Sequence, residues 1–172
     1  MSLTDHRRLL IVWHSRTGAA RQLAEQAQQG ARLILTELNE GGRIHVQRME
    51  CTQVREADLL HADAYLFCAP ENLGSLSGAM KEFFDRLYYP ALDQLNGRPY
   101  AALISAGSDG HGALAQLERI CTGWRLEAAR PAQIFNFQAQ TPEAILRPKI
   151  LDAEQARHAQ EAGAHLAALL CL

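Results

Sequence analysis

Short apolar runs alternate with longer amphipathic stretches along the chain. Leu9 to Trp13, Ala64 to Ala69 and Tyr100 to Ser105 are continuous hydrophobic segments. Each is too short to be a buried helix and therefore predicts a strand covered on both faces, as in the interior of a parallel sheet. A less hydrophobic run at Ile44 to Met49 predicts a strand nearer the sheet edge, and we expect a fifth strand around Ala132 to Phe137.

Apolar residues recur at helical spacing in the segments between these strands. One face of the first such segment carries Leu23, Ala27, Ala31, Ile34 and Leu38. Further helices are predicted over residues 54–61, 77–88, 113–124 and 152–170. We expect Ser77 to cap the second of these helices and Pro70 to end the strand before it. Residues 138–151 hold two prolines and no clear period, which predicts a connection.

This order of elements indicates the fold class. Strand and helix patterns alternate about five times, which predicts an α/β protein with an open, five-stranded parallel sheet and helices on both faces. The length of 172 residues suits one domain, and we expect a single domain over residues 1–172. In such sheets ligands bind beyond the carboxyl ends of the strands. Loops 14–20, 70–78 and 106–112 are rich in small residues and each follows a strand, so we predict that they form one site.

The first of these loops has the chemistry of an anion site. It joins the first strand to a helix whose unpaired N–H groups and positive dipole end point into the turn. Ser15 and Thr17 add hydroxyl donors, Arg16 adds a guanidinium, and Gly18 lets the backbone approach closely. The alternative is an ordinary strand-to-helix turn in which Thr17 only caps the helix, and this loop alone does not decide between the two.

Composition and charge exclude several classes of protein. The chain has 17 Lys and Arg against 19 Asp and Glu, with a formal net charge of −2. That balance argues against a nucleic-acid binder and, less strongly, against the highly acidic surface of a dedicated electron carrier. No apolar run approaches the ~20 residues needed to cross a bilayer, so we expect a cytoplasmic protein without a membrane segment. The four cysteines are irregularly spaced, which predicts reduced thiols, with Cys68 in the core, and no metal site.

The three loops together favour one kind of ligand. One anion-binding turn and two loops rich in Gly, Ser and Asn suit a molecule that is phosphorylated at one end and flat, with many hydrogen-bonding edges, at the other. Flavin mononucleotide (FMN) has both properties. A dinucleotide fits less well, because its G-x-G-x-x-G fingerprint is absent after the first strand.

The same segments resemble a known family. HSRTGAAR, residues 14–21, looks like the phosphate loop of flavodoxin-like proteins. PENLGSLSGAMKEFFDRLYY, residues 70–89, closely resembles the second flavin loop and following helix of the NAD(P)H-dependent FMN reductases and quinone reductases, and SAGSDGHGAL, residues 105–114, resembles their third loop. The resemblance covers roughly residues 7–137.

This resemblance carries expectations about fold and function. It implies a flavodoxin-like three-layer α/β/α sandwich with strand order 2-1-3-4-5 and non-covalent FMN. It implies NAD(P)H as the electron donor, a quinone-like or other small molecule as the acceptor, and a homodimer or homotetramer. The pair Tyr88-Tyr89 is a candidate interface patch.

The resemblance also assigns roles to individual residues. Those that fall where the family holds the phosphate are Ser15, Arg16, Thr17, Gly18, Ala19 and Ala20. Those that fall along the isoalloxazine are Pro70, Glu71, Asn72, Leu73 and Gly74, and those on its far rim are Ala106, Gly107, Ser108, Gly110 and His111. Two positions depart from the family. Ala20 replaces a Ser or Thr, which would remove one hydrogen bond worth ~1 kcal/mol, and Asn72 replaces an aromatic residue.

Several functions stay open. The leading hypothesis is an oxidoreductase in which the flavin does the chemistry, backbone N–H groups of residues 72–74 and 107–110 favour its anionic reduced state, and His111 is the one candidate acid or base. No side chain need act as acid or base, and the alternative for His111 is that it orders its loop or faces solvent. The alternatives are a flavodoxin-type electron carrier that NAD(P)H does not reduce directly, and a domain that has lost its cofactor. A receiver domain is set aside, because His14-Ser15 and Ala69-Pro70 stand where it needs acidic residues.

Overall fold

Seven strands and seven helices make up residues 6–172, the part of the chain that the computed structural model describes. The strands are β1 (Arg7–Trp13), β2 (Ile44–Glu50), β3 (Ala64–Asn72), β4 (Ser75–Leu76), β5 (Pro99–Ala106), β6 (Glu127–Ala128) and β7 (Gln133–Asn136). The helices are α1 (Ala19–Glu37), α2 (Glu56–Leu60), α3 (Gly78–Arg86), α4 (Tyr88–Ala91), α5 (His111–Gly123), α6 (Pro142–Leu146) and α7 (Ala153–Leu169). None of the helices described is both long and apolar enough to span a membrane.

The strands form one sheet in the order β2-β1-β3-β5-β6, with β4 paired to β3 and β7 paired to β5. All pairs are parallel except β3 with β4. The predicted α/β architecture and strand order are confirmed, and the predicted fifth strand is divided into β6 and β7 along the same edge of β5. Pro131 lies between the two pieces, and a proline has no N–H to donate to a sheet.

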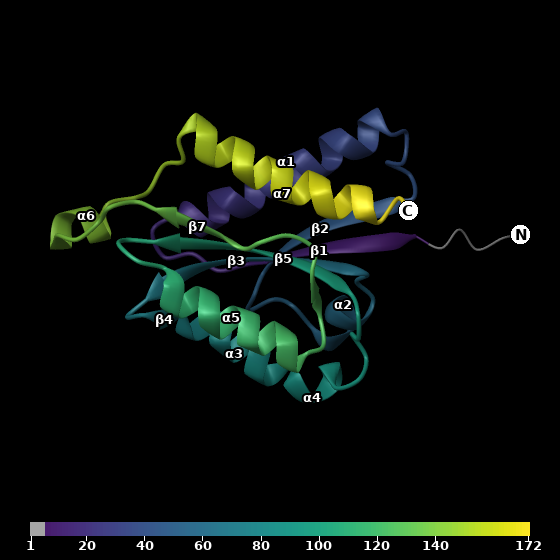
Figure 1. Ribbon diagram of the computed structural model, residues 1–172, viewed down its shortest axis with the longest axis horizontal. Coiled ribbons are helices and arrows are strands. Elements are labelled where there is room, and N and C mark those ends of the chain that lie inside the picture. The colour runs from purple at the N-terminus through teal and green to yellow at the C-terminus, as the bar shows by residue number, and fades with distance from the viewer. Residues whose placement is uncertain (1–5) are drawn as a thin grey trace, which may run out of the picture.

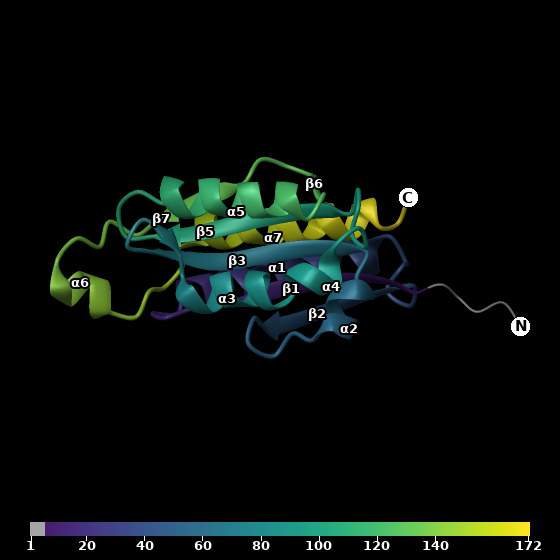
Figure 2. The same cartoon turned by 90° about the horizontal axis from the view of Figure 1, so that it is seen from below.

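Helices cover both faces of the sheet. α1 and α7 lie side by side over one face, and α3, α4 and α5 lie over the other (Figure 1), as the turned view in Figure 2 also shows. Side chains of β1 alternate between two hydrophobic clusters, with Leu10 and Val12 in one and Leu9 and Ile11 in the other. Because both faces are buried, every central position of the strand is apolar, which is why the sequence pattern predicts it.

The backbones of α1 and α7 touch. A Cβ atom at Gly163 would lie 1.8 Å from the Ala27 carbonyl oxygen, and one at Gly30 would lie 2.0 Å from the Gln160 carbonyl oxygen. Only glycine fits at these two positions, because a real Cβ does not approach backbone atoms this closely. At its start, α7 is capped by Asp152, whose carboxylate accepts the Gln155 N–H at 2.8 Å. The segment that leads into α7 is therefore held in a fixed place relative to α1.

Other sequence predictions also differ from the structure. On α1 it is Leu35 that is buried, whereas Leu38 lies beyond the helix and is exposed. β3 does not end at Pro70 but pairs there with Ser105 and continues to Asn72. The 138–151 connection contains the short helix α6, which buries no residue and therefore has no apolar period to detect.

Candidate functional site

The three loops predicted to form one site lie at the carboxyl ends of β1, β3 and β5, which are neighbours in the sheet. Direct contacts join them. His14 Nδ1 lies 2.8 Å from Ser77 Oγ, which connects the first loop to the second. The Glu71 carboxylate accepts backbone N–H groups from Gly110 and from Ala113, which connects the second loop to the third.

The first loop ends in a helix N-terminus without a side-chain cap. Gly18 is the N-cap of α1, with φ of 94°, and its N–H donates to Ser15 Oγ at 3.0 Å. Thr17 is therefore not the capping residue. The first turn of α1 carries no acidic residue, and Ala19 and Ala20 turn their methyl groups into the core. Arg16 is exposed beside the loop. An anion placed here would be stabilised by the dipole of a 19-residue helix and by the Arg16 charge.

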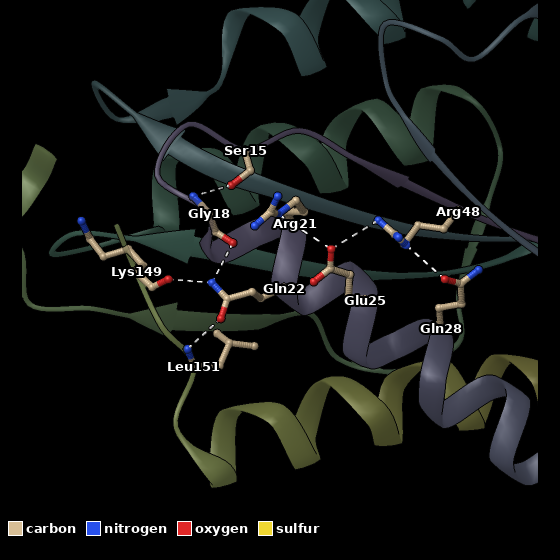
Figure 3. Close-up of polar contacts among 9 residues, drawn as sticks. All are labelled: Ser15, Gly18, Arg21, Gln22, Glu25, Gln28, Arg48, Lys149 and Leu151. Atoms are coloured by element: carbon tan, nitrogen blue, oxygen red, sulfur yellow. Dashed lines mark hydrogen bonds and ion pairs between the residues drawn. The ribbon is translucent and has the colours of Figure 1, made fainter. Parts of the chain in front are cut away.

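A distant segment of the chain packs against this loop. The Lys149 N–H donates to the Thr17 carbonyl oxygen at 2.8 Å. The Gln22 side chain donates to the carbonyl oxygens of Gly18 at 3.1 Å and Lys149 at 2.6 Å, and it accepts the Leu151 N–H at 3.2 Å (Figure 3). Sequence reasoning missed Gln22 and residues 149–151, since no local pattern indicates that they meet.

The second loop is a tight hairpin. β3 and β4 are joined by Leu73 and Gly74, both with positive φ, at 52° and 74°. Two consecutive residues of this kind form the turn that matches the twist of a two-residue hairpin. The tip is open to solvent, because the Leu73 side chain is fully exposed and a Cβ at Gly74 would contact nothing.

Glu71 fixes this hairpin to the start of α5. One carboxylate oxygen accepts the Gly110 N–H, and the other accepts the Ala113 N–H at 3.2 Å. The contact is close, since a Cβ at Gly112 would lie 2.0 Å from the Gly74 carbonyl oxygen. The second and third loops are therefore one unit. The positive end of α5 already faces a carboxylate, unlike that of α1.

The third loop is held by residues at and after the end of β7. The Ala139 N–H donates to the Gly107 carbonyl oxygen at 2.7 Å, and the Asn136 amide donates to the Ser108 carbonyl oxygen. His111 Nδ1 lies 2.8 Å from Asp109 Oδ1, and the two side chains are 77% and 66% exposed. His111 therefore faces solvent beside the loop and is free to meet a ligand there.

His14 and Ser77 form a buried polar pair between the first loop and α3. Ser77 is the N-cap residue of α3, as predicted, but its hydroxyl lies against the His14 ring and does not cap the helix. Burial lowers the pKa of His14 below its usual 6.5, and the Arg16 charge lowers it further, while Glu50 acts in the opposite direction. The ring is therefore neutral at neutral pH.

The sequence predicts no metal site and places Cys68 in the core. Across residues 6–172, no group of three His, Cys, Asp or Glu side chains is placed to hold a metal ion. Cys68 is fully buried, and burial raises its pKa well above the ordinary value for a thiol.

A parallel sheet of this order, with an uncapped helix N-terminus after its first strand, defines a flavodoxin-like α/β protein. Residues 14–141 match the model of the family described as NADPH-dependent FMN reductase. The chain belongs to that family, as the resemblance in its loops predicts.

Curated relatives point the same way. A flavodoxin of Aquifex aeolicus (strain VF5) is 29% identical over 105 residues, which cover 61% of this chain and 53% of that protein. A probable NAD(P)H dehydrogenase (quinone) FQR1-like 2 of Arabidopsis thaliana is 26% identical over 120 residues, which cover 61% of this chain and 44% of that protein. The chain thus spans about half the length of these relatives. The family description indicates FMN as the cofactor.

Solved structures support the fold. A flavodoxin from the domain Archaea superposes with a TM-score of 0.74 at 15% identity and covers 96% of this chain and 99% of its own. A flavodoxin, WrbA-like protein from Agrobacterium tumefaciens superposes with a TM-score of 0.69 at 16% identity, covering 95% and 96%. At these identities the likeness establishes the flavodoxin-like fold.

Proposed function

We propose that this chain is an FMN-dependent oxidoreductase that passes a hydride or electrons from NAD(P)H to a quinone-like or other small acceptor. The observation that carries the proposal is the contrast between two helix N-termini at the same edge of the sheet. That of α5 faces the Glu71 carboxylate, whereas that of α1 has no acidic residue in its first turn. This contrast favours α1 as the place where an anionic group binds, with the flat part of the same ligand against the adjoining loops.

The α1 end fits a phosphate. Ser15, Arg16, Thr17 and Gly18 are the residues proposed to hold it, through hydroxyl groups, a guanidinium and backbone N–H groups. Ser15 Oγ accepts the Gly18 N–H, and its own O–H remains able to donate to a phosphate oxygen. Ala20 is fully buried and has no hydroxyl, so it contributes only its backbone.

The second and third loops are proposed to hold the isoalloxazine. Residues 70–74 would border one side, and Ala106, Gly107, Ser108, Gly110 and His111 the far rim. The sequence predicts that the Gly110 N–H is among the groups that face the flavin, but this N–H is bonded to the Glu71 carboxylate and is not available. The N–H groups of residues 72–74 and 107–109 remain as candidates to stabilise negative charge on the ring.

Bound FMN supplies the hydride and electron chemistry in such a protein. The chain positions the flavin and places charges around it, and His111 is the proposed proton-donating side chain. The His111→Ala variant should lower turnover with a quinone without changing FMN content. His61→Ala, an exposed histidine that follows α2, is the matched control. Unchanged turnover in His111→Ala would remove this residue from the mechanism.

The decisive test is an absorption spectrum of the protein with FMN, followed without oxygen as NADPH and then NADH are added. We expect flavin bands that bleach with at least one nucleotide. Flavin that stays bound and oxidised with both would support the second candidate, a flavodoxin-type electron carrier, which the flavodoxin relative also favours. Protein that binds no flavin would contradict both candidates.

We also propose a homodimer or homotetramer. Tyr88 and Tyr89 are 42% and 77% exposed, and their ring centroids lie 5.3 Å apart at the start of α4. Exposed paired aromatic side chains are enriched at subunit interfaces. Light scattering should give a mass above that of one chain, and replacing both tyrosines with serine should reduce it. A monomeric wild-type protein would contradict this proposal.

A further inference from the structure

The carbonyl groups of the first loop are held on the side away from its N–H groups. The Lys149 N–H bonds to the Thr17 carbonyl oxygen at 2.8 Å, and the Gly18 carbonyl oxygen accepts both the backbone N–H and the side-chain amide of Gln22, each at 3.1 Å. In a planar trans peptide the C=O and the following N–H point in opposite directions. These bonds therefore turn the N–H groups of Gly18 and Ala19 to the other side, where Gly18 meets Ser15 Oγ.

The Gln22 amide is at the centre of this arrangement. Its NH₂ group donates to two carbonyl oxygens, one in the loop and one at Lys149, and its oxygen accepts the Leu151 N–H (Figure 3). A side-chain amide can donate two hydrogens and accept at its oxygen, so both sides of the group are engaged. One half-buried side chain thus joins α1 to residues 149–151.

Residues 149–151 are themselves fixed at both ends. The Lys149 ammonium donates to the carbonyl oxygens of Ala144, Ile145 and Arg147 at 2.7, 3.0 and 2.6 Å, which closes the end of α6. Directly after Leu151, Asp152 caps α7, and α7 packs backbone to backbone on α1. The segment therefore gives Gln22 a rigid partner.

We propose that Gln22 is a positioning residue for the cofactor phosphate. By joining residues 149–151 to the first loop, its side chain keeps the Lys149 N–H on the Thr17 carbonyl oxygen and so holds the Gly18 N–H toward the place where the phosphate binds. The proposal rests on the proposed function, and it assigns a role in cofactor binding to a residue outside the loop itself. Loss of the amide should weaken binding of the phosphate and leave binding of the flavin ring unchanged.

The test compares FMN with riboflavin, which has the same ring and no phosphate. Dissociation constants are measured on the full chain, freed of flavin, from quenching of flavin fluorescence. We expect Gln22→Met, which keeps the side-chain length, to raise the Kd for FMN about tenfold and to leave the Kd for riboflavin within about twofold, as expected for the loss of one or two hydrogen bonds. Gln28→Met is the matched control, because Gln28 is also half-buried on α1 but bonds to Arg48.

A second variant keeps the proposal testable if Gln22→Met does not fold. Gln22→Glu keeps an acceptor for the Leu151 N–H but sets a negative charge beside the phosphate, so FMN should bind still more weakly. Unchanged FMN binding, or an equal loss for FMN and riboflavin, would overturn the role of Gln22 while leaving the proposed function intact. A wild-type chain that binds neither flavin would overturn the proposed function and this role with it.

Discussion

Adding one methyl group at Gly163 should force α1 and α7 apart. A Cβ there would lie 1.8 Å from the Ala27 carbonyl oxygen and 2.9 Å from the Ala27 Cα. Ordinary contact begins near 3.4 Å, so the two backbones must separate by about 1.6 Å. The opposing atoms belong to a helix backbone and cannot rotate away, unlike the end of a flexible side chain.

The expected loss follows from two opposing effects. Overpacking of a core costs 1–3 kcal/mol, and a rigid backbone neighbour places this substitution at about 3 kcal/mol. Alanine is about 1 kcal/mol better than glycine inside a helix, which offsets part of the cost. The net loss is about 2 kcal/mol, which for a chain of this length lowers the Tm by roughly 4–8 °C.

Thermal unfolding followed by circular dichroism measures this shift. Gly123→Ala is the control, because Gly123 closes α5 and a Cβ there would contact nothing within 4 Å. That variant should be as stable as wild type or slightly more stable. A Gly163→Ala variant with the wild-type Tm would refute the reasoning, since it would mean that the contact between α1 and α7 yields without cost.

Three further predictions concern single side chains. Glu71→Gln should lower the free energy of unfolding by about 2 kcal/mol, because the one oxygen of the new amide can accept only one of the two N–H groups at the start of α5. Glu118→Gln, at an exposed position on α5, is the control and should not lower it. Equal urea midpoints for Glu71→Gln and wild type would contradict this prediction. Stability should fall as the pH drops below 6.5, because the unfolded ring of His14 takes up a proton there while the folded ring, with its lowered pKa, does so only at lower pH. His14→Asn should show a smaller decrease, and an identical pH profile would exclude this cause. A thiol reagent should modify Cys171 first, because Cys51, Cys68 and Cys121 are buried and should react only after unfolding. Four fast-reacting thiols in the folded protein would contradict the burial of these three.

The sequence predicts the central strands because a strand that is buried on both faces is apolar at every central position. β1, β3 and β5 are apolar at consecutive central positions, and these runs are too short to form buried helices. By contrast, α6 buries no residue and is held by its ends, where Thr141 Oγ1 accepts the Ala144 N–H and Lys149 contacts the last carbonyl groups. Capping of this kind has no hydrophobic period, so the helix was not predicted.

The candidate site also has parts that the sequence predicts and parts that it does not. The loop at residues 14–20 could be predicted, because its donors are adjacent in sequence and lie between a strand and a helix. The hairpin at Leu73 and Gly74 could not, because its first turn residue is a leucine, which gives no turn signal. Gln22 was also missed, since its partner Lys149 lies 127 residues away. Donor groups that are adjacent in the sequence can be predicted from it, whereas contacts between distant segments depend on the completed fold.

The distance between Gln22 and Lys149 along the chain has a consequence for biosynthesis. A ribosome adds about 5–20 residues per second, so the 127 residues between the two take on the order of 10 s to make. During that interval the nascent chain has the first loop but not the segment that holds its carbonyl groups. On the proposed role of Gln22, firm binding of FMN cannot precede translation of residue 151, however early residues 14–20 leave the ribosome.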